Sequence, residues 1–416
     1  MKHKIILPII YLILYGLLIS CNAHNTTNIT TNDNLYIINI DSAKVFNTLL
    51  YSDIFKSVKV ITLSNKETLI GQIDKIQPYK DKLYILDSNI AKGVFEFNEN
   101  GDFIRKIGSL GSGPGEYVSC QDFAINEKKE EILIQDAYNS RIYIYDIQSG
   151  KYKSYIDIQE KNKIEHIWIN DGNLYGVDSY FIGNGKKTYH ILQQINETTG
   201  SIIAEWMEAD KYNKGWNDEF IHTPLFYPID KDKDLFAFGL CDSIMCIQKD
   251  KLYPYIVLTG KNRIQNGEIP QEMISSSANA NIRNQKNNEF FYKFLTQNKF
   301  IYISYIFEHN NYIYIDYSTI LFKQHIRYNK TNKETHIYKS LEDDLLYSKI
   351  PKSHSILPFA TSDSKGVYSI LQTENLPELK YFAQEEGTIS SCIINKNKLK
   401  EINEDSNPII LYYEFK

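Results

Sequence analysis

Hydrophobic and polar positions alternate in short runs along most of the chain, and one arrangement of these runs is written twice. The first copy covers residues 83–108 and the second covers residues 132–157. Asp87 corresponds to Asp136 and Gly101 to Gly150, since 136 − 87 and 150 − 101 are both 49. Each copy has a hydrophobic run ending in Asp, a loop, an alternating run, a Gly turn and a third alternating run. Strand repeats of about this length are typical of propeller blades.

The same pattern predicts a series of four-stranded antiparallel units. In the first unit we expect an innermost strand over 69–76, followed by strands over 82–87, 93–98 and 103–107. Residues 41–55 lack clear alternation and are predicted to be helical or loop. We expect the later strands at 121–126, 131–136, 141–146, 151–156, 164–170, 173–178, 189–196, 201–206, 225–228, 235–238, 243–249, 252–258, 300–306, 312–317, 325–329, 335–338 and 367–371, and a short helix at 378–386.

The two ends of this pattern are both strongly strand-like. Residues 58–63 alternate near the start, and residues 409–415 form an apolar run at the end. A ring of blades must close on itself or leave exposed sheet edges, which promote aggregation. We therefore predict that these two strands share one blade. Spacing alone leaves six, seven or eight blades possible.

Composition supports a mainly β protein and excludes one class of partner. The chain has 32 Tyr and 20 Phe, and aromatic residues suit the half-buried surface of a sheet. The formal net charge is −5, and no stretch gathers the excess of Lys and Arg that binding to nucleic acid requires. We expect no nucleic-acid partner.

The N-terminus has the pattern of an export signal. Lys2 and Lys4 precede an apolar run over 5–19, which is long enough for a signal peptide and short for a membrane span. The run ends in Leu18-Ile19-Ser20-Cys21, which resembles a bacterial lipoprotein signal with Cys21 as the lipidated residue. This predicts a signal peptide over 1–20, a flexible polar tether over 21–34 and one domain over 35–416. Acyl chains on Cys21 would hold the protein to a membrane.

Several motifs together resemble a known family. They are SDIFKSVKVITLS, LIGQIDKI, FIRKIGSLGSGPGEY and the ending NPIILYYEFK, and the run after GSGPGEY is similar to the NHL-type repeat. The chain over 35–416 looks like the six-bladed β-propeller lipoproteins of Bacteroides-like bacteria. The resemblance implies six four-stranded blades and an envelope location, and it implies no reaction. Surface-exported lipoproteins of these bacteria carry acidic residues just after the Cys, whereas the first acid here is Asp33. We therefore expect an anchor in the outer membrane that faces the periplasm, with exposure at the cell surface as the alternative.

Motifs for catalysis and for cofactors are weak. The Gly-rich run over 111–115 lacks the Lys-Ser/Thr of a P-loop, and no H-E-x-x-H or nucleophile-elbow sequence occurs. Residues 230–234 alternate Asp and Lys but lack the Gly and Glu of a calcium loop, so we interpret them as a solvated turn. We expect no cofactor and no metal. The alternative is a metal-dependent hydrolase or lyase in which His166, His222 and His354 converge at the channel mouth through folding.

Aromatic side chains in irregular segments are the better candidates for binding, because loops carry function and aromatic rings suit sugar faces or peptides. The Gly-rich loop adds an acid and a tyrosine that could project near the channel mouth, or else pack the crossing between two blades. The recurring Asp87, Asp136 and Asp178 are expected to bond loop backbone N–H groups. We predict a non-enzymatic protein that binds a protein, peptide or glycan at one face of the ring. The candidate binding residues are Glu116, Tyr117, Trp168, Tyr180, Trp216, Phe220, His222 and Tyr227.

Overall fold

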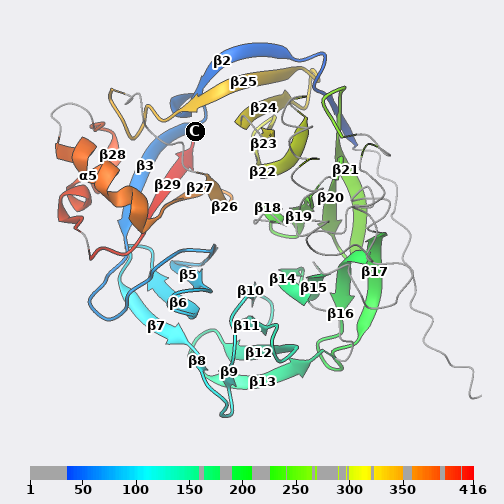
Figure 1. Ribbon diagram of the computed structural model, residues 1–416, viewed down its shortest axis with the longest axis vertical. Coiled ribbons are helices and arrows are strands. Elements are labelled where there is room, and N and C mark those ends of the chain that lie inside the picture. Colours follow the sequence, from blue (N-terminus) through cyan, green and yellow to red (C-terminus); the bar gives the residue numbers. More distant parts are fainter. Residues whose placement is uncertain are drawn as a thin grey trace, which may run out of the picture.

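Six small sheets are arranged in a ring around a central opening (Figure 1). The computed structural model of the chain describes residues 35–158, 164–178, 190–208, 225–239, 241–264, 299–319, 323–349, 358–384, 389–403 and 405–416, and single positions at 268, 289 and 297. The ring is a six-bladed β-propeller, which confirms the predicted fold class.

Blades 1 to 3 each have four antiparallel strands, and their order from the centre outwards follows the chain. Blade 1 comprises β4 (Lys75–Tyr79), β5 (Lys82–Asp87), β6 (Gly93–Asn98) and β7 (Phe103–Ile107). Blade 2 comprises β10 (Asp122–Asn126), β11 (Glu131–Asp136), β12 (Arg141–Asp146) and β13 (Tyr152–Asp157). Blade 3 comprises β14 (Ile164–Asn170), β15 (Asn173–Asp178), β16 (His190–Ile195) and β17 (Ile202–Glu208). A two-stranded pair, β8 (Ser109–Leu110) and β9 (Glu116–Tyr117), lies between blades 1 and 2.

Blades 4 to 6 each have five strands, one more than predicted. Blade 4 comprises β18 (Phe226–Asp230), β19 (Lys233–Phe236), β20 (Ser243–Gln248) and β21 (Lys251–Thr259), with β1 (Tyr36–Asn39) outermost. Blade 5 comprises β22 (Phe300–His309), β23 (Tyr312–Thr319), β24 (Lys323–Asn329) and β25 (Thr335–Glu342), with β2 (Lys44–Leu50) outermost. Blade 6 comprises β26 (Phe359–Ser362), β27 (Gly366–Leu371), β29 (Ile409–Phe415), β3 (Phe55–Thr62) and β28 (Ile393–Ile394).

The prediction of loop or helix over 41–55 was wrong for residues 44–50, because β2 lies along the outer edge of β25 in parallel. Four of its seven residues are exposed, so the strand has no sustained alternation that the sequence could display. Backbone pairing with β25 holds it in place, which is a long-range interaction that local pattern does not reveal.

The predicted innermost strand of blade 1 was also misplaced, since the strand is β4 at Lys75–Tyr79 and residues 69–74 form a loop. In this loop, backbone N–H groups bond to side chains. The N–H groups of Gly71 and Gln72 donate to Asp87 Oδ2 at 2.8 and 3.2 Å, and that of Ile73 donates to the Gln372 side chain at 3.0 Å. These bonds replace the ladder that a strand would need.

The glycine that recurs in the repeat has a steric role in packing one blade on the next. Gly101, between β6 and β7, has a φ of +89°, and a Cβ there would overlap the carbonyl oxygen of Thr62 at the end of β3. Gly200 in blade 3 stands in the same way against the carbonyl oxygen of Asp157 at the end of β13. The turn glycine is therefore required both by its own backbone conformation and by the neighbouring blade.

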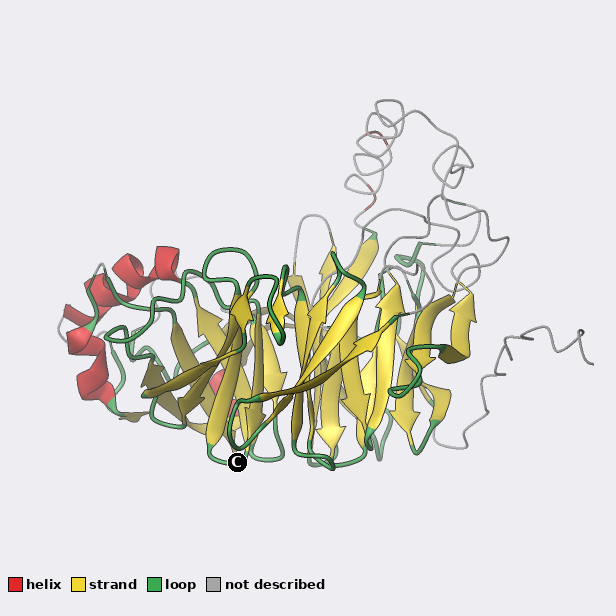
Figure 2. Ribbon diagram, turned by 90° about the horizontal axis from the view of Figure 1, so that it is seen from below, coloured by secondary structure: helices red, strands yellow, loops and turns green. Residues whose placement is uncertain are grey.

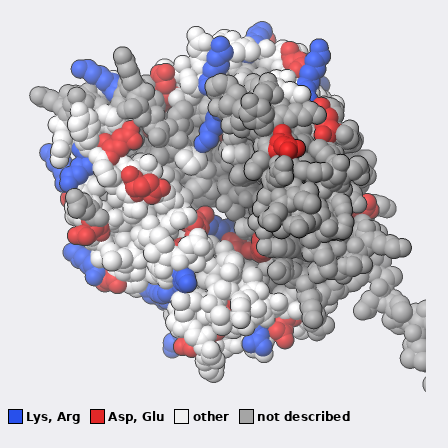
Figure 3. Space-filling view, in the orientation of Figure 1, with Lys and Arg blue, Asp and Glu red and all other residues white. Residues whose placement is uncertain are grey.

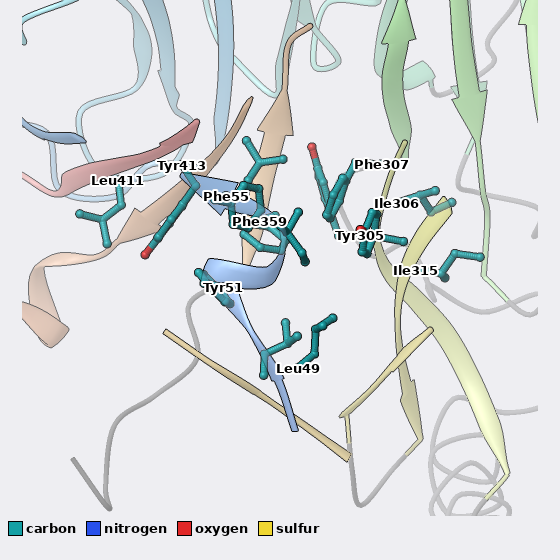
Figure 4. Close-up of a cluster of buried hydrophobic side chains, with 14 of the residues drawn as sticks. Leu49, Tyr51, Phe55, Tyr305, Ile306, Phe307, Ile315, Phe359, Leu411 and Tyr413 are labelled. Carbon is teal, nitrogen blue, oxygen red and sulfur yellow. The ribbon is translucent and has the colours of Figure 1, made fainter. Parts of the chain in front are cut away.

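The predicted closure of the ring is confirmed, because β29 pairs antiparallel with β3 from Ile409↔Thr62 to Phe415↔Phe55. A cluster of buried side chains seals blade 6 against blade 5 (Figure 4). In it Phe55 packs against Tyr413, Phe359 and Phe307, with ring centroids 5.5 to 6.1 Å apart. Residues from both ends of the chain thus share one apolar core with blade 5.

The ring has two unlike faces. We call the upper face the one on which the chain crosses from the outer strand of one blade to the inner strand of the next, and Figure 2 shows it at the top. The hairpins between second and third strands also turn there. The helix α5 (Leu376–Gln384), predicted at 378–386, lies on this face in blade 6, beside η2 (Thr373–Asn375) and η3 (Lys396–Glu401). The short helix η1 (Tyr51–Asp53) joins β2 to β3.

Candidate functional site

The upper face of blades 1 and 2 is built by two buried carboxylates in equivalent positions. In blade 1, Asp87 accepts the N–H groups of Gly71 and Gln72 on Oδ2, and that of Ile90 on Oδ1 at 2.8 Å. In blade 2, Asp136 accepts the Val118 N–H on Oδ2 at 2.8 Å and the Ser119 hydroxyl on Oδ1 at 2.6 Å. The expected structural role of these two Asp residues is confirmed.

Each carboxylate therefore fastens the incoming loop to the tip of the second hairpin of its blade. Because the loop and the tip are held by backbone bonds, their side chains are free to point outwards. Four of them are apolar or aromatic and exposed, which we call the upper-face patch: Leu69, Ile90, Val118 and Tyr138, with 66%, 65%, 44% and 79% of their surface exposed. The Ile90 side chain lies directly over Gly71, and a Cβ added to Gly71 would overlap it.

The space-filling view, drawn from the upper face, shows how charges are distributed over the blades (Figure 3). The surface at the lower left of this view, over blades 1 and 2, is mostly uncharged between the rim and the central opening. Lys, Arg, Asp and Glu gather mainly towards the rim. Exposed apolar side chains gathered on one face mark interaction surfaces more often than scattered ones do, and the four of the upper-face patch lie at equivalent places on the same face of two successive blades.

A polar cluster lies at the upper ends of three inner strands. Lys75 on β4 places its Nζ 2.7 Å from Asp122 Oδ1 on β10, and it also donates to the Phe123 carbonyl at 2.7 Å. Asp122 Oδ2 accepts the backbone N–H of Ile167 on β14 at 2.9 Å, and His166 Nδ1 lies 3.6 Å from the same oxygen. The cluster links blades 1, 2 and 3 through one carboxylate.

The electrostatics of this cluster fit a structural link. Burial by itself disfavours the charged form of Asp122, but the charge of Lys75 and the hydrogen bond and charge of His166 outweigh it, so the pKa of Asp122 lies below its ordinary value. Lys75 also lies over the rings of Phe123 and Trp168, at 5.4 and 5.2 Å from their centroids. Lys75 and Asp122 are thus both paired with groups of this same chain.

The predicted pair in the Gly-rich loop lies at the crossing between blades 1 and 2. Tyr117 is fully buried, and its hydroxyl donates to the Ile107 carbonyl at 3.2 Å. Glu116 accepts the Gly113 N–H at 2.8 Å and so closes its own loop. Figure 1 shows β8 and β9 between β7 and β13, in the outer part of the ring. The roles of Glu116 and Tyr117 in ligand binding stay predictions.

The predicted aromatic residues fall into two groups. Trp168 and Tyr227 are buried between blades: Trp168 stacks on Phe226 with centroids 5.3 Å apart, and Tyr227 contacts Tyr305 edge-on at 5.5 Å. Four further residues lie outside the described residues, namely Tyr180, Trp216, Phe220 and His222. Of the eight predicted binding residues, the described part of the structure brings none into the upper-face patch.

The upper-face patch was not predicted from the sequence, because the candidates were aromatic residues in irregular segments and not residues at hairpin tips. Ile90 follows Asp87 by three residues and Tyr138 follows Asp136 by two, at positions where a turn normally carries polar residues. An apolar residue placed just after each recurring Asp was the available signal.

Of the three histidines in the metal-dependent alternative, His166 lies beside Asp122, while His222 and His354 lie outside the described residues. Among the described residues, no group of three or more His, Cys, Asp or Glu side chains is placed to hold a metal ion. No helix in the described part of the chain is both long and apolar enough to cross a bilayer.

Comparisons with known proteins give a family model and a fold. The model described as "Domain of unknown function (DUF4934)" matches residues 35–414. No protein with curated annotation matches the chain.

Solved structures are similar over most of the ring. A Bacteroides fragilis protein, described as a "Putative exported protein", has 17% identity and a TM-score of 0.66, with 92% of this chain and 99% of that one covered. A DUF4221 family member from Bacteroides vulgatus has 12% identity and a TM-score of 0.47, covering 87% and 97%. BamB from Moraxella catarrhalis has 8% identity and a TM-score of 0.38, covering 86% and 99%. The first of these supports the propeller fold alone.

Proposed function

Because the chain belongs to the DUF4934 family, whose description names no activity, we propose its function from its own geometry. It is a non-enzymatic protein of the cell envelope, held by a lipid on Cys21, that binds a protein, peptide or glycan at the upper face of the ring. The observation that carries this proposal is the upper-face patch.

The patch suits binding because its supports are rigid while its side chains are exposed. Exposing large apolar side chains to water costs free energy, at roughly 25 cal/mol per Å² of apolar surface. Covering them with a partner recovers it. The carboxylates of Asp87 and Asp136 already hold the backbone beneath the patch, so little conformational entropy is lost on binding.

The envelope location is supported by the N-terminal pattern. Two lysines, an apolar run over 5–19 and the Leu-Ile-Ser-Cys sequence ending at Cys21 precede the tether and the ring. The B. fragilis protein of similar fold is itself described as exported. An anchor facing the periplasm in the outer membrane fits the absence of acidic residues directly after Cys21.

A patch variant tests the binding role. The triple variant Ile90→Ser, Val118→Ser, Tyr138→Ser should lose at least about tenfold in retention of envelope proteins or glycans, because each substitution removes desolvation energy of about 1–2 kcal/mol. The measurement is quantitative pull-down from envelope extracts and binding to a glycan array.

A matched control uses three apolar residues exposed elsewhere on the blades. The variant Ile104→Ser, Ile203→Ser, Ile394→Ser alters exposed side chains on β7, β17 and β28, which are 41%, 48% and 45% exposed. It should bind as the unmodified protein does. Equal binding by the patch variant and this control would contradict the proposed site.

A further inference from the structure

The N-terminal segment 36–50 runs along the outer edges of two successive blades, and we call it the belt. Its first part, β1, pairs in parallel with β21 of blade 4, and its second part, β2, pairs in parallel with β25 of blade 5. Figure 1 shows β2 lying along β25 at the rim. An extended segment added in parallel to an outer strand is therefore a mode of binding that this fold already uses.

Blade 4 shows the backbone geometry of this mode. A bulge lies between the pairs Ile244↔Ile256 and Met245↔Pro254, and β1 pairs with the four residues that follow it, Ile256–Thr259. The N–H of Leu258 points inwards to the Asp242 carbonyl at 3.0 Å, while the carbonyl of Thr259 points outwards and accepts the Ile40 N–H at 2.8 Å. Alternate residues of the outer strand thus face the added segment.

Blade 2 has the same bulge at the same place. There it lies between the pairs Ile144↔Ser154 and Tyr145↔Tyr152, so that Ser154–Asp157 corresponds to Ile256–Thr259. The N–H of Ile158 points inwards to the Ser140 carbonyl at 2.9 Å. By alternation, Tyr155 and Asp157 present their backbone groups outwards. In the described part of the chain, β13 is the last strand of its sheet, with no fifth strand beyond it.

Blades 1 and 3 also lack a fifth strand, but they carry a different type of residue at the position that Tyr155 has in blade 2. The bulge register places Lys106 of blade 1 and Glu205 of blade 3 where blade 2 has Tyr155. Lys106 is partly buried and donates to the Ala91 carbonyl at 3.2 Å, and Glu205 is buried 3.6 Å from His190. An inward-turned charge at this position opposes edge-to-edge pairing. In blade 2 the position carries a tyrosine that is 45% exposed, and the Arg141 guanidinium lies 4.5 Å from its ring centroid.

The belt also shows how an added strand contacts an aromatic outer strand. In blade 5, Phe46 of β2 pairs with Tyr338 of β25, and their rings stack with centroids 5.3 Å apart. In blade 4, Tyr36 of β1 packs edge-on against Tyr255 at 5.2 Å. In blade 2, Tyr152 and Tyr155 are exposed on the outer strand.

We propose that the outer edge of β13 binds an extended segment of a partner protein, added in parallel as a fifth strand of blade 2. Its residue opposite Tyr155 is aromatic or large and aliphatic. Its backbone carbonyls accept the outward N–H groups of Tyr155 and Asp157. This site lies on the rim of the ring and is independent of the upper-face patch.

The experiment uses the full-length protein in detergent and a phage-displayed library of linear 12-residue peptides. We expect enrichment of peptides with a central aromatic or large aliphatic residue. The matched variants are Asp157→Pro and Asp157→Ala: both lose the ion pair with Arg141, and only the first lacks the outward N–H. Enriched peptides should bind the Pro variant at least about tenfold more weakly than the Ala variant.

A second variant keeps the test decisive if the Pro variant does not fold. Tyr155→Glu leaves the edge N–H in place and introduces the charge found at the equivalent position of blade 3, so it should also abolish binding. Two results would overturn the proposal: no enrichment over the unselected library, or equal binding by the two Asp157 variants with Tyr155→Glu still active.

Discussion

Asp234 shows at the residue scale how burial changes the chemistry of one carboxyl. The sequence places it in an alternating Asp-Lys segment, which we interpreted as a solvated turn. In the structure Asp234 is buried on β19, and its Oδ2 accepts the indole N–H of Trp168 at 2.7 Å and the amide of Asn170 at 2.9 Å. Burial raises the pKa of Asp234 to about 7, although these two hydrogen bonds act in the opposite direction.

A raised pKa in the folded state makes stability depend on pH in a definite direction. Between the ordinary pKa near 4 and the folded value near 7, the folded protein binds a proton that the unfolded chain releases, so the free energy of unfolding falls as pH rises. We expect Asp234→Asn to keep both hydrogen bonds through its carbonyl oxygen. It should be more stable than the unmodified protein at pH 8, by on the order of 1–4 kcal/mol, and similar to it at pH 5.

Chemical denaturation at the two pH values checks this prediction. A smaller dependence of the free energy of unfolding on pH will remain in Asp234→Asn, because burial also raises the pKa of Asp343 to about 6. An unchanged difference between pH 5 and pH 8 in Asp234→Asn would show that Asp234 does not titrate in this range.

At the element scale, strands are predicted well where one blade contains all the information. Strands β5, β6 and β7 begin and end at the predicted residues, since each is a hydrophobic or alternating run bounded by Asp, Asn or Gly. The outermost strand β2 was missed because four of its residues are exposed and its partner β25 lies 292 residues away at the pair Thr48↔Ser340 (340 − 48). The upper-face patch was missed likewise, because exposure of a hairpin tip depends on the loop that packs beneath it.

The strand β29 is the element on which closure depends, and Leu411 is its fully buried centre, paired with Val60 of β3 and Ser369 of β27. Leu411→Ala should lower the free energy of unfolding by about 2–5 kcal/mol, because a cavity forms where the two chain ends meet. The exposed Ile394 on β28 provides the control, and Ile394→Ala should change it by less than about 0.5 kcal/mol. Urea unfolding followed by tyrosine fluorescence measures both, and equal effects would argue against a closure that depends on β29.

At the scale of the whole molecule, the ring and its anchor are separate units in our interpretation. The ring requires residues from 36 to 415, because β1, β2 and β3 at the start and β29 at the end belong to its sheets. The proposed anchor precedes these strands in the sequence, with the predicted tether over 21–34 between them. Loss of the lipid should therefore change where the protein is found and leave its fold unchanged.

The variant Cys21→Ser tests the anchor. It cannot be acylated, so we expect the protein to move from the membrane pellet to the soluble fraction of the envelope while its thermal midpoint stays the same. Fractionation by ultracentrifugation and a thermal melt of the purified protein measure the two properties. Membrane retention of Cys21→Ser would contradict a lipid anchor at this residue.

The sequence by itself determined the class of fold, the blade repeat, the closing pair of strands and the structural role of Asp87 and Asp136, because alternation, turn residues and a repeated carboxylate act within one blade. Only the tertiary structure decided which side chains are exposed, where the belt lies and which carboxyls are buried. These properties arise between blades, where residues far apart in the chain exclude water from one another, and no local pattern records that exclusion.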